Sequence, residues 1–176
     1  MSKRMELFLV VSLVIVGVFT RLIPHPANFT ALGALALWST TLFPRRSWAL
    51  AIPLGILVLS DMILGFHSTM LWVYGTFALI AFASFWIQPK VSWTRAISGS
   101  LCASLFFFVV TNFGVWLVDG LYPMTAEGLA NCYVMALPFL KNQIAGDLFF
   151  TVLIGALIKV LHSVRVSGAE TSVHGS

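Results

Sequence analysis

The chain has 176 residues, of which 59% are hydrophobic and only 9% are charged, and its mean hydropathy is +0.97. A soluble domain carries about a quarter charged residues, so this composition argues against a water-soluble globular protein and predicts that lipid surrounds most of the chain. The net charge of +4 is carried by short basic clusters between apolar runs, which indicates membrane topology and gives no sign of nucleic-acid binding.

Six apolar segments follow one another along the chain and predict six membrane helices. They cover about residues 5–20, 29–43, 47–66, 69–87, 96–118 and 134–161. The first is interpreted as a retained helix, because no signal-peptide cleavage site follows Phe19. The second is shorter than the roughly 20 residues of a spanning helix, so either it tilts or the loop before it dips into the protein.

The predicted fold class is therefore an all-α integral membrane protein, a bundle of six transmembrane helices. Residues 1–165 are expected to form this single domain, and residues 166–176 a disordered cytoplasmic tail. Cys102 and Cys132 are too far apart in the chain to suggest a disulfide framework, and both are expected to be buried small apolar residues.

Lysine and arginine are unevenly divided between the ends of the predicted helices. With the N-terminus inside, eight of the ten lie at cytoplasmic ends and two lie outside. The inner set is Lys3, Arg4, Arg45, Arg46, Lys90, Arg95, Lys159 and Arg165, and the outer set is Arg21 and Lys141. This bias predicts that both termini are cytoplasmic.

The first outer loop, "RLIPHPANFT" at residues 21–30, is unusually polar and rigid. Its two prolines fix the backbone and cannot continue the first helix. We interpret the stretch as a stiff lip that presents Arg21, His25 and Asn28 to a site, with Asn28 or Thr30 capping the second helix. The alternative is a tight turn whose polar groups are satisfied locally.

Further polar residues lie in the outer halves of the predicted helices. Asp61 lies about a turn below the outer end of the third helix, His67 follows it on "GFHS", and Asn112 lies in the fifth helix. The sixth contains "PFLKNQIAGDLFF", in which Gln143 and Asp147 are four residues apart and share a face. Asp147 lies about 13 Å beyond Pro138, close to the middle of the membrane.

Ionisable groups at such depth need a partner or a water-filled cavity. One interpretation is structural, with Arg21 and Lys141 pairing with Asp61 and Asp147 to lock helices together. The other is a binding pocket open to the outer side, because three outer loops and several outer half-helices supply polar groups. The predicted substrate-binding residues are Arg21, His25, Asn28, Asp61, His67, Asn112, Trp116, Tyr122, Tyr133, Lys141, Asn142, Gln143 and Asp147.

Trp116, Tyr122 and Tyr133 belong to this set because they lie near the outer face and could line a pocket for a flat ligand, although an aromatic belt at the membrane border is the favoured explanation for them. His25, His67 and Asp61 could in principle hold a metal ion, but no HxH or HExxH spacing supports one. The chain has no phosphate-binding loop and no nucleophile elbow. We therefore expect no metal, no cofactor and no catalytic residue.

The segments "RLIPHPANFTALGALAL", "LSDMILGFH", "TNFGVWL", "YPMTAEGLANCYVMALPFLKN" and "GDLFFT" together resemble a family of small bacterial multi-pass membrane proteins of unknown function. The resemblance covers roughly residues 20–155 and implies a location in the bacterial inner membrane. More loosely, the chain resembles the substrate-binding S components of energy-coupling-factor (ECF) vitamin transporters. That resemblance implies a site built from residues 21–30, 64–69 and 119–133, and an ECF-type ATPase and coupling module as partner.

The leading hypothesis is thus a membrane-embedded subunit that binds a vitamin-like small molecule from the outer side for uptake, and is not an enzyme. Its expected partners are membrane lipid and the ligand, and no nucleic acid. A structural scaffold is the main alternative. A membrane enzyme is the second, with acid–base chemistry by Asp61 and His67 or by Asp147 and His25.

Overall fold

The fold is all-helical in the computed structural model, which describes residues 3–43, 46–87 and 92–174. Within helices, the side chains of residues 3–6, 9, 46 and 161–174 lie outside this description. The six helices are α1 (Lys3–Leu22), α2 (Leu32–Leu42), α3 (Arg46–Leu64), α4 (Met70–Ile87), α5 (Trp93–Val118) and α6 (Ala126–His174). The predicted number of helices is confirmed.

Four of these helices have a segment that is long and apolar enough to cross a membrane. The segments are Ser47–Leu64, Met70–Ile87, Trp93–Val118 and Ala126–Val160, and the shorter apolar helices are Val10–Leu22 and Leu32–Leu42. The prediction of a helical membrane protein is therefore supported by length and composition. The orientation in the membrane stays a prediction.

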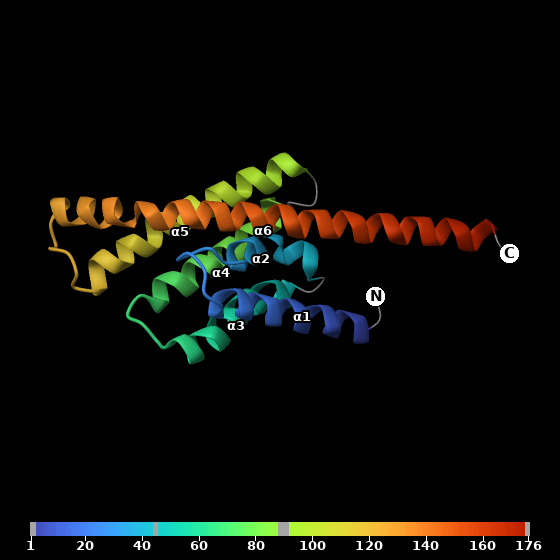
Figure 1. Ribbon diagram of the computed structural model, residues 1–176, viewed down its shortest axis with the longest axis horizontal. Coiled ribbons are helices and arrows are strands. Elements are labelled where there is room, and N and C mark those ends of the chain that lie inside the picture. Colours follow the sequence, from blue (N-terminus) through green and yellow to red (C-terminus); the bar gives the residue numbers. More distant parts are fainter. Residues whose placement is uncertain (1–2, 44–45, 88–91, 175–176) are drawn as a thin grey trace.

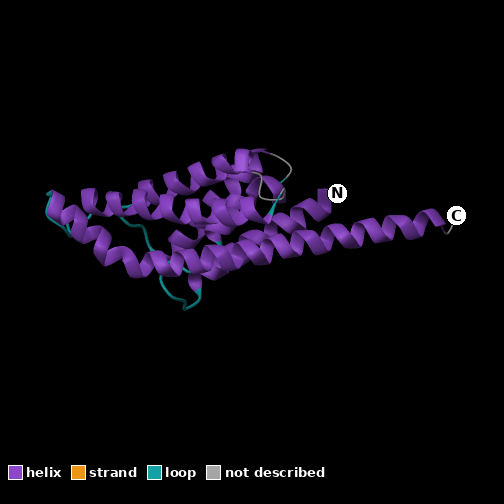
Figure 2. Ribbon diagram, turned by 90° about the horizontal axis from the view of Figure 1, so that it is seen from above, coloured by secondary structure: helices purple, strands orange, loops and turns teal. Residues whose placement is uncertain are grey.

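Consecutive helices run back and forth along the long axis of the molecule, so the two ends of the chain lie at the same end (Figure 1). The connections 23–31, 65–69 and 119–125 lie toward the opposite side, which we call the loop end. α6 is by far the longest helix and runs past all the others (Figure 2). These three connections are the predicted outer loops, and the fold brings them toward one another.

The short helix α2 forms the centre of the bundle. Every residue from Leu32 to Ser39 is buried, and α2 packs against α3, α4, α5 and α6. Eleven residues of α-helix are about 16 Å long, roughly half the thickness of the hydrocarbon layer. Residues 29–31 pack into the bundle ahead of α2, whereas residues 23–28 are mostly exposed. Whether the segment tilts in the membrane or the loop before it dips stays a prediction.

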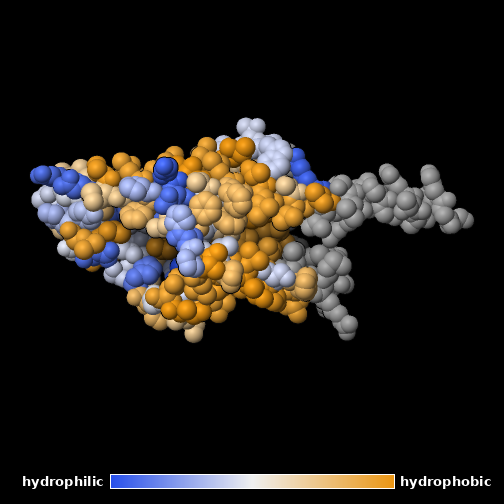
Figure 3. All heavy atoms as spheres, in the orientation of Figure 1, coloured by the Kyte–Doolittle hydropathy of each residue, from blue (hydrophilic) through white to orange (hydrophobic). Residues whose placement is uncertain are grey.

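The outer surface of the bundle is strongly apolar away from the loop end (Figure 3). Trp86 is 68% exposed, Ile15 60% and Leu79 53%, whereas several serines and threonines are buried inside. Large apolar side chains outside and small polar ones inside suit a protein surrounded by lipid. Cys132 is buried as predicted, but Cys102 lies exposed on α5, so the prediction for Cys102 was wrong. Cysteine is small and apolar, so hydropathy alone did not show that this position faces outward.

Two glycines allow α6 to approach its neighbours closely. A Cβ atom on Gly33 of α2 would overlap the carboxylate of Asp147, and one on Gly146 of α6 would lie 3.0 Å from the Cα atom of Phe29. Phe29 also stacks against Phe149 and Phe150, with ring centroids 6.1 and 5.9 Å away. The lip and the start of α2 are therefore pressed against the middle of α6.

α6 begins at Ala126, although the sequence predicts helix only from residue 134. Thr125 explains the earlier start, since its hydroxyl accepts the backbone N–H of Gly128 at 3.1 Å and so caps the helix. Residues 126–133, predicted as outer loop, are thus helical. α6 also continues to His174, so residues 166–174 are helical where a disordered tail is predicted. The side chains of these residues lie outside the description. The domain boundary at residue 165 stays a prediction.

Candidate binding site

The lip between α1 and α2 is a tight turn with two internal hydrogen bonds. The N–H of Phe29 donates to the carbonyl of Pro26 at 2.9 Å, and the N–H of Thr30 donates to that of Asn28 at 3.1 Å. Asn28 has a φ of 67°, in the left-handed region that Asn tolerates better than most residues. Asn28 therefore shapes the turn.

The predicted N-cap of α2 was wrong. Ala31 occupies that position and offers no side-chain hydrogen bond, because Asn28 and Thr30 are used within the turn that precedes it. The hydroxyl of Thr20 at the end of α1 accepts the N–H of Ala31 at 3.4 Å. The lip is thus fastened to α1 rather than to α2.

Arg21 forms an ion pair below the lip, as the structural interpretation predicts. Its Nη2 atom lies 2.6 Å from Oδ1 of Asp61 on α3, and the hydroxyl of Tyr74 on α4 donates to Oδ2 at 2.9 Å. The side chain of Asp61 is 1% exposed and that of Arg21 is 15% exposed. The contact joins three helices and leaves the guanidinium edge of Arg21 beside a cavity.

This first cavity, which we call the lip cavity, has a volume of about 410 Å³. It is half polar and opens between α1, α4 and α6, and its lining is Arg21, His25, Asn28, Thr30, Leu32, Leu64, His67, Thr69, Val73, Phe77, Phe107 and Gln143. Five residues of the predicted site line it, from four separate segments of the chain: Arg21, His25, Asn28, His67 and Gln143. A volume of this size suits a small organic ligand.

His25 carries the clearest unfilled position in the lip cavity. Its Nδ1 atom lies 2.8 Å from the carbonyl oxygen of Pro26, which can only accept, so Nδ1 holds the proton. Nε2 is buried and has no hydrogen-bond partner among the described residues. In the neutral ring Nε2 is an acceptor, so the cavity offers a buried lone pair that only a guest or water can satisfy.

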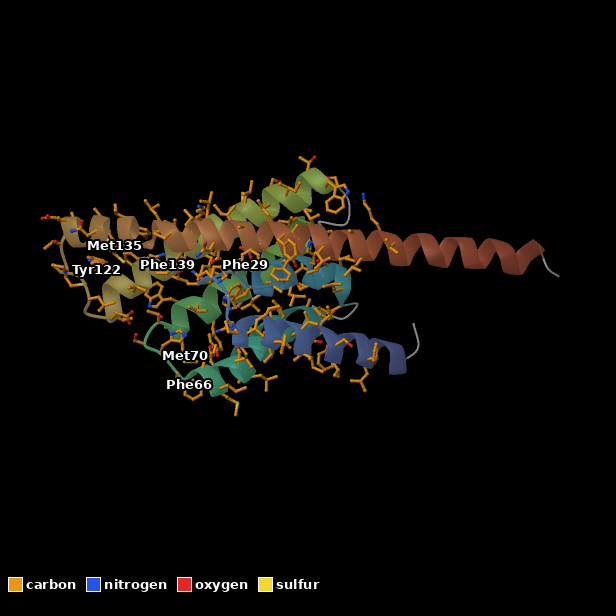
Figure 4. All side chains as sticks on the ribbon, viewed as in Figure 1. Phe29, Phe66, Met70, Tyr122, Met135 and Phe139 are labelled. Carbon is orange, nitrogen blue, oxygen red and sulfur yellow. The ribbon has the colours of Figure 1, made fainter. Side chains whose placement is uncertain are left out.

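A second cavity of about 400 Å³ continues from the first toward the loop end. Asn28, Thr69, Val73 and Phe107 line both cavities, so the two are adjacent. The rest of the second lining is more apolar: Ala27, Thr111, Asn112, Val115, Asp119, Leu121, Tyr122, Cys132, Met135, Ala136 and Phe139. Figure 4 shows Tyr122, Met135 and Phe139 together on this side of α6, and we call the space the aromatic cavity.

Asp147 lies behind the lip cavity and does not line it. It is 3% exposed, and its Oδ2 atom accepts the hydroxyl of Ser104 at 2.7 Å and the side-chain amide of Gln143 at 3.1 Å. No lysine or arginine of the described residues pairs with it, so of the two ion pairs in the structural interpretation only Arg21 with Asp61 is present among the described residues, and Lys141 does not pair with Asp147. Those two residues are six apart on one helix and face different sides.

Six residues of the predicted site line neither cavity: Asp147, Asp61, Trp116, Tyr133, Lys141 and Asn142. Trp116 donates from its ring to the carbonyl of Pro123 at 2.9 Å, and the hydroxyl of Tyr133 donates to that of Val109 at 2.7 Å. Lys141 is exposed and Asn142 is half-buried on other faces of α6. Asp61 does not line a cavity but binds Arg21, which does. Asn112 and Tyr122 line the aromatic cavity.

Several residues in the walls were missed by the sequence reasoning. Thr69 lines both cavities and binds Nδ1 of His67 at 2.9 Å, while Tyr74 and Ser104 hold the two buried carboxylates. Their sequence signal is weak, because a single hydroxyl in an apolar run looks like an ordinary helix residue. Ser68 and Asp119, which are hydrogen-bonded across the loop end, were likewise not singled out.

No cluster of three histidine, cysteine, aspartate or glutamate side chains occurs among the residues whose placement is described. Asp61 is engaged by Arg21 and Tyr74, and His25 and His67 have other partners.

Comparison with known proteins gives one match. A family model described as a family of unknown function (DUF6580) matches residues 1–169, nearly the whole chain. The searches of curated proteins and of solved structures returned no match.

Proposed function

We propose, for a chain that belongs to this DUF6580 family of unknown function, that the lip cavity and the aromatic cavity together bind one small amphipathic molecule. The protein would act as a membrane-embedded substrate-binding subunit that takes up a vitamin-like solute. The observation that carries the proposal is the buried, unpartnered Nε2 of His25 in a cavity that Arg21 and Gln143 also line. An unpaired buried acceptor costs free energy that a bound donor would recover.

The polar groups of the lip cavity specify the chemistry of one end of the ligand. Arg21 offers only donors, so it suits a carboxylate, phosphate or carbonyl oxygen. His25 offers an acceptor, and Gln143 uses one amide N–H on Asp147, which leaves its carbonyl oxygen and its second N–H. The ligand end should therefore combine an anionic or carbonyl oxygen with N–H or O–H donors, as polar heterocycles do.

The aromatic cavity specifies the other end. Its lining of aromatic, methionine and aliphatic side chains favours a flat or apolar group, with Asn112 and Asp119 as the polar exceptions. Two adjoining spaces of about 400 Å³, one half polar and one mostly apolar, suit a single elongated guest.

The direction of uptake follows from the charge bias. With both termini cytoplasmic, the loop end faces outward and the cavities open to the outer side of a bacterial inner membrane. A subunit without its own energy source would need a partner such as an ECF-type ATPase and coupling module. This subunit would bind and hand over its ligand without catalysis.

The test is identification of small molecules released from the gently purified protein by mass spectrometry, followed by thermal-shift titration of each. The His25→Ala variant should bind the identified compound about 3–10-fold more weakly, the cost of one lost hydrogen bond. Asn142→Ala is the control, because Asn142 lies on α6 beside the cavity residue Gln143 and lines neither cavity. Equal loss in both variants, or an empty protein that no nutrient stabilises, would refute the proposal.

A structural scaffold is the second candidate, because both buried carboxylates connect helices. Asp61 joins α1, α3 and α4, and Asp147 joins α5 and α6. It predicts that variants of Asp61 lower stability while no small molecule raises it. The enzyme alternative has less support: the described hydrogen bonds of Asp61 and Asp147 go to other partners, and none joins either to a histidine.

A further inference from the structure

A buried acceptor-rich cluster lies below the lip cavity, between α5 and α6. Its centre is the Asp147 carboxylate, described above, which has no basic partner in the described part of the chain. The hydroxyl of Ser104 has a single proton but lies within hydrogen-bond distance of two acceptors, Asp147 Oδ2 at 2.7 Å and the carbonyl oxygen of Ser100 at 3.0 Å. The hydroxyl can therefore donate to only one of them at a time, while Asp147 Oδ2 also accepts the side-chain amide of Gln143 at 3.1 Å.

Two further hydroxyls extend the cluster by one helical turn. Ser100 is four residues before Ser104 on α5, and Thr151 is four residues after Asp147 on α6, so each shares a face with its neighbour. Because the two helices are antiparallel and Ser104 touches Asp147, Ser100 and Thr151 occupy the next facing pair. They are 2% and 0% exposed.

Neither of these hydroxyls has a hydrogen-bond partner among the residues described. This is unusual within the molecule. Ser60, Thr76 and Thr111, which are also buried in helices, all donate to the carbonyl four residues earlier. A buried hydroxyl without a partner costs free energy. Two of them facing the same interface as a buried carboxylate indicate that something else supplies the missing interaction.

We infer that Asp147, Ser104, Ser100 and Thr151 form a binding site for a monovalent cation, sodium. All available ligand atoms are oxygens, which hard cations prefer, and the single carboxylate balances a single positive charge. A divalent ion would leave excess charge inside the membrane, which is costly. Protonation of Asp147 alone would neutralise the carboxylate but would leave the Ser100 and Thr151 hydroxyls without partners.

The start of α2 is the competing explanation for Asp147. Gly33 is the second residue of α2, and its missing side chain lets the carboxylate lie against the positive end of that helix dipole. No described hydrogen bond runs from α2 to Asp147, and this explanation gives no partner to Ser100 or Thr151. The two explanations predict different effects of removing those hydroxyls.

Gln143 connects the cation site to the lip cavity, because it lines the cavity and donates to Asp147. An ion bound at Asp147 would draw the carboxylate away from the amide and change what Gln143 offers to a ligand. This coupling rests on the proposed function of the cavity, whereas the cation site itself does not.

The test is sodium binding to the purified full-length protein in detergent. Thermal unfolding is followed while sodium chloride replaces choline chloride at constant ionic strength, and radioactive sodium binding is measured by equilibrium dialysis. We expect a saturable rise in Tm with sodium. Asp147→Asn and Thr151→Val should lose both the rise and the binding. Thr76→Val is the matched control: Thr76 is equally buried but donates to Trp72, and this variant should keep the sodium response.

A wild-type protein that neither binds sodium nor is stabilised by it would overturn the inference. So would an unchanged sodium response in both Thr151→Val and Ser100→Ala, which would leave Asp147 as a partner of α2 only. These two variants remove hydroxyls that have no partner, so they keep the test valid if Asp147→Asn does not fold. His25→Ala should retain the sodium response even where it loses ligand, which separates failure of this site from failure of the proposed binding function.

Discussion

Arg21, Asp61 and Tyr74 hold one end of the candidate site in place. The ion pair joins α1 to α3, and the tyrosine hydroxyl ties the same carboxylate to α4. Burying two charges in an apolar bundle costs desolvation free energy. A short ion pair with an additional hydrogen bond offsets that cost. The position of the Arg21 guanidinium beside the lip cavity thus depends on a residue that does not line it.

Removing the carboxylate should therefore be far more damaging than removing the hydroxyl. We expect Asp61→Ala to lower the free energy of unfolding by about 3–5 kcal/mol, because it leaves a buried guanidinium unpaired. Tyr74→Phe should cost only about 1 kcal/mol, since Arg21 still satisfies Asp61. Unfolding in mixed detergent and denaturant measures both. Similar small losses in the two variants would show that Arg21 finds water or another partner.

The sequence indicated which ionisable residues could form ion pairs, but it predicted their actual partners only in part. Arg21 with Asp61 is one of the ion pairs the structural interpretation allows, and it forms. Asp147 was expected to need a partner or a water-filled cavity, and its described partners are a hydroxyl and an amide. The sequence did indicate that Gln143 shares a face with Asp147, but it did not indicate Ser104, because a serine four residues from another serine in an apolar helix has no distinctive pattern.

The central helix α2 depends on a close approach at a single position. Gly33 has no side chain where the carboxylate of Asp147 lies against the helix, and α2 is buried on all sides there. A bundle that builds its core from one short helix has little freedom to shift it, because every face of that helix is already in contact. Small changes at this position should thus affect the whole core.

Gly33→Ala should accordingly destabilise the protein by about 1–3 kcal/mol, the usual cost of overpacking. Gly55→Ala on α3 is the matched control: a Cβ there meets nothing within 4 Å, and alanine favours helix by up to about 1 kcal/mol over glycine. Thermal unfolding of the two variants in the same detergent should therefore shift Tm in opposite directions. A Gly33→Ala variant as stable as Gly55→Ala would mean that Asp147 moves away freely.

Helices were easier to predict than their ends. Hydropathy located all six, because a long apolar run in a chain this poor in charge has few other outcomes. The start of α6 was missed by eight residues, because "AEGLANCY" is not apolar enough to be recognised as membrane helix. Its helicity comes from the Thr125 cap and from packing on α5, and the second of these is a tertiary effect.

At the scale of the whole molecule, the predicted orientation rests on two features. Successive helices run in opposite directions, and most lysines and arginines lie at the end opposite the loop end. In a background where Cys102 and Cys132 are replaced by Ala, Ser68→Cys at the loop end should react with a membrane-impermeant maleimide in intact cells. Ser47→Cys, another exposed serine at the opposite end, should react only after permeabilisation. The reverse pattern would invert the topology and place the cavities on the cytoplasmic side.

The cavities themselves could not have been predicted as shapes. The polar lip and Gln143 were recognisable as unusual, but Val73, Phe77 and Phe107 are ordinary apolar residues that become walls only when α4 and α5 pack around α2. The separation into a half-polar and a mostly apolar space likewise depends on Thr69 and Phe107, which line both. Which residues meet is set by packing, and one sequence carries little information on it.

The shortness of α2 also affects how the protein would respond to membrane voltage. Leu32, the first residue of α2, lines the lip cavity. The distance from the cavity to the other end of α2 is therefore the length of that helix, roughly 16 Å. If water fills the cavities, most of the transmembrane potential falls across this thin layer. An elementary charge crossing it exchanges about 2.3 kcal/mol per 100 mV with the field. An occupant of the region around Asp147 would therefore be held or expelled by the membrane potential as well as by its contacts.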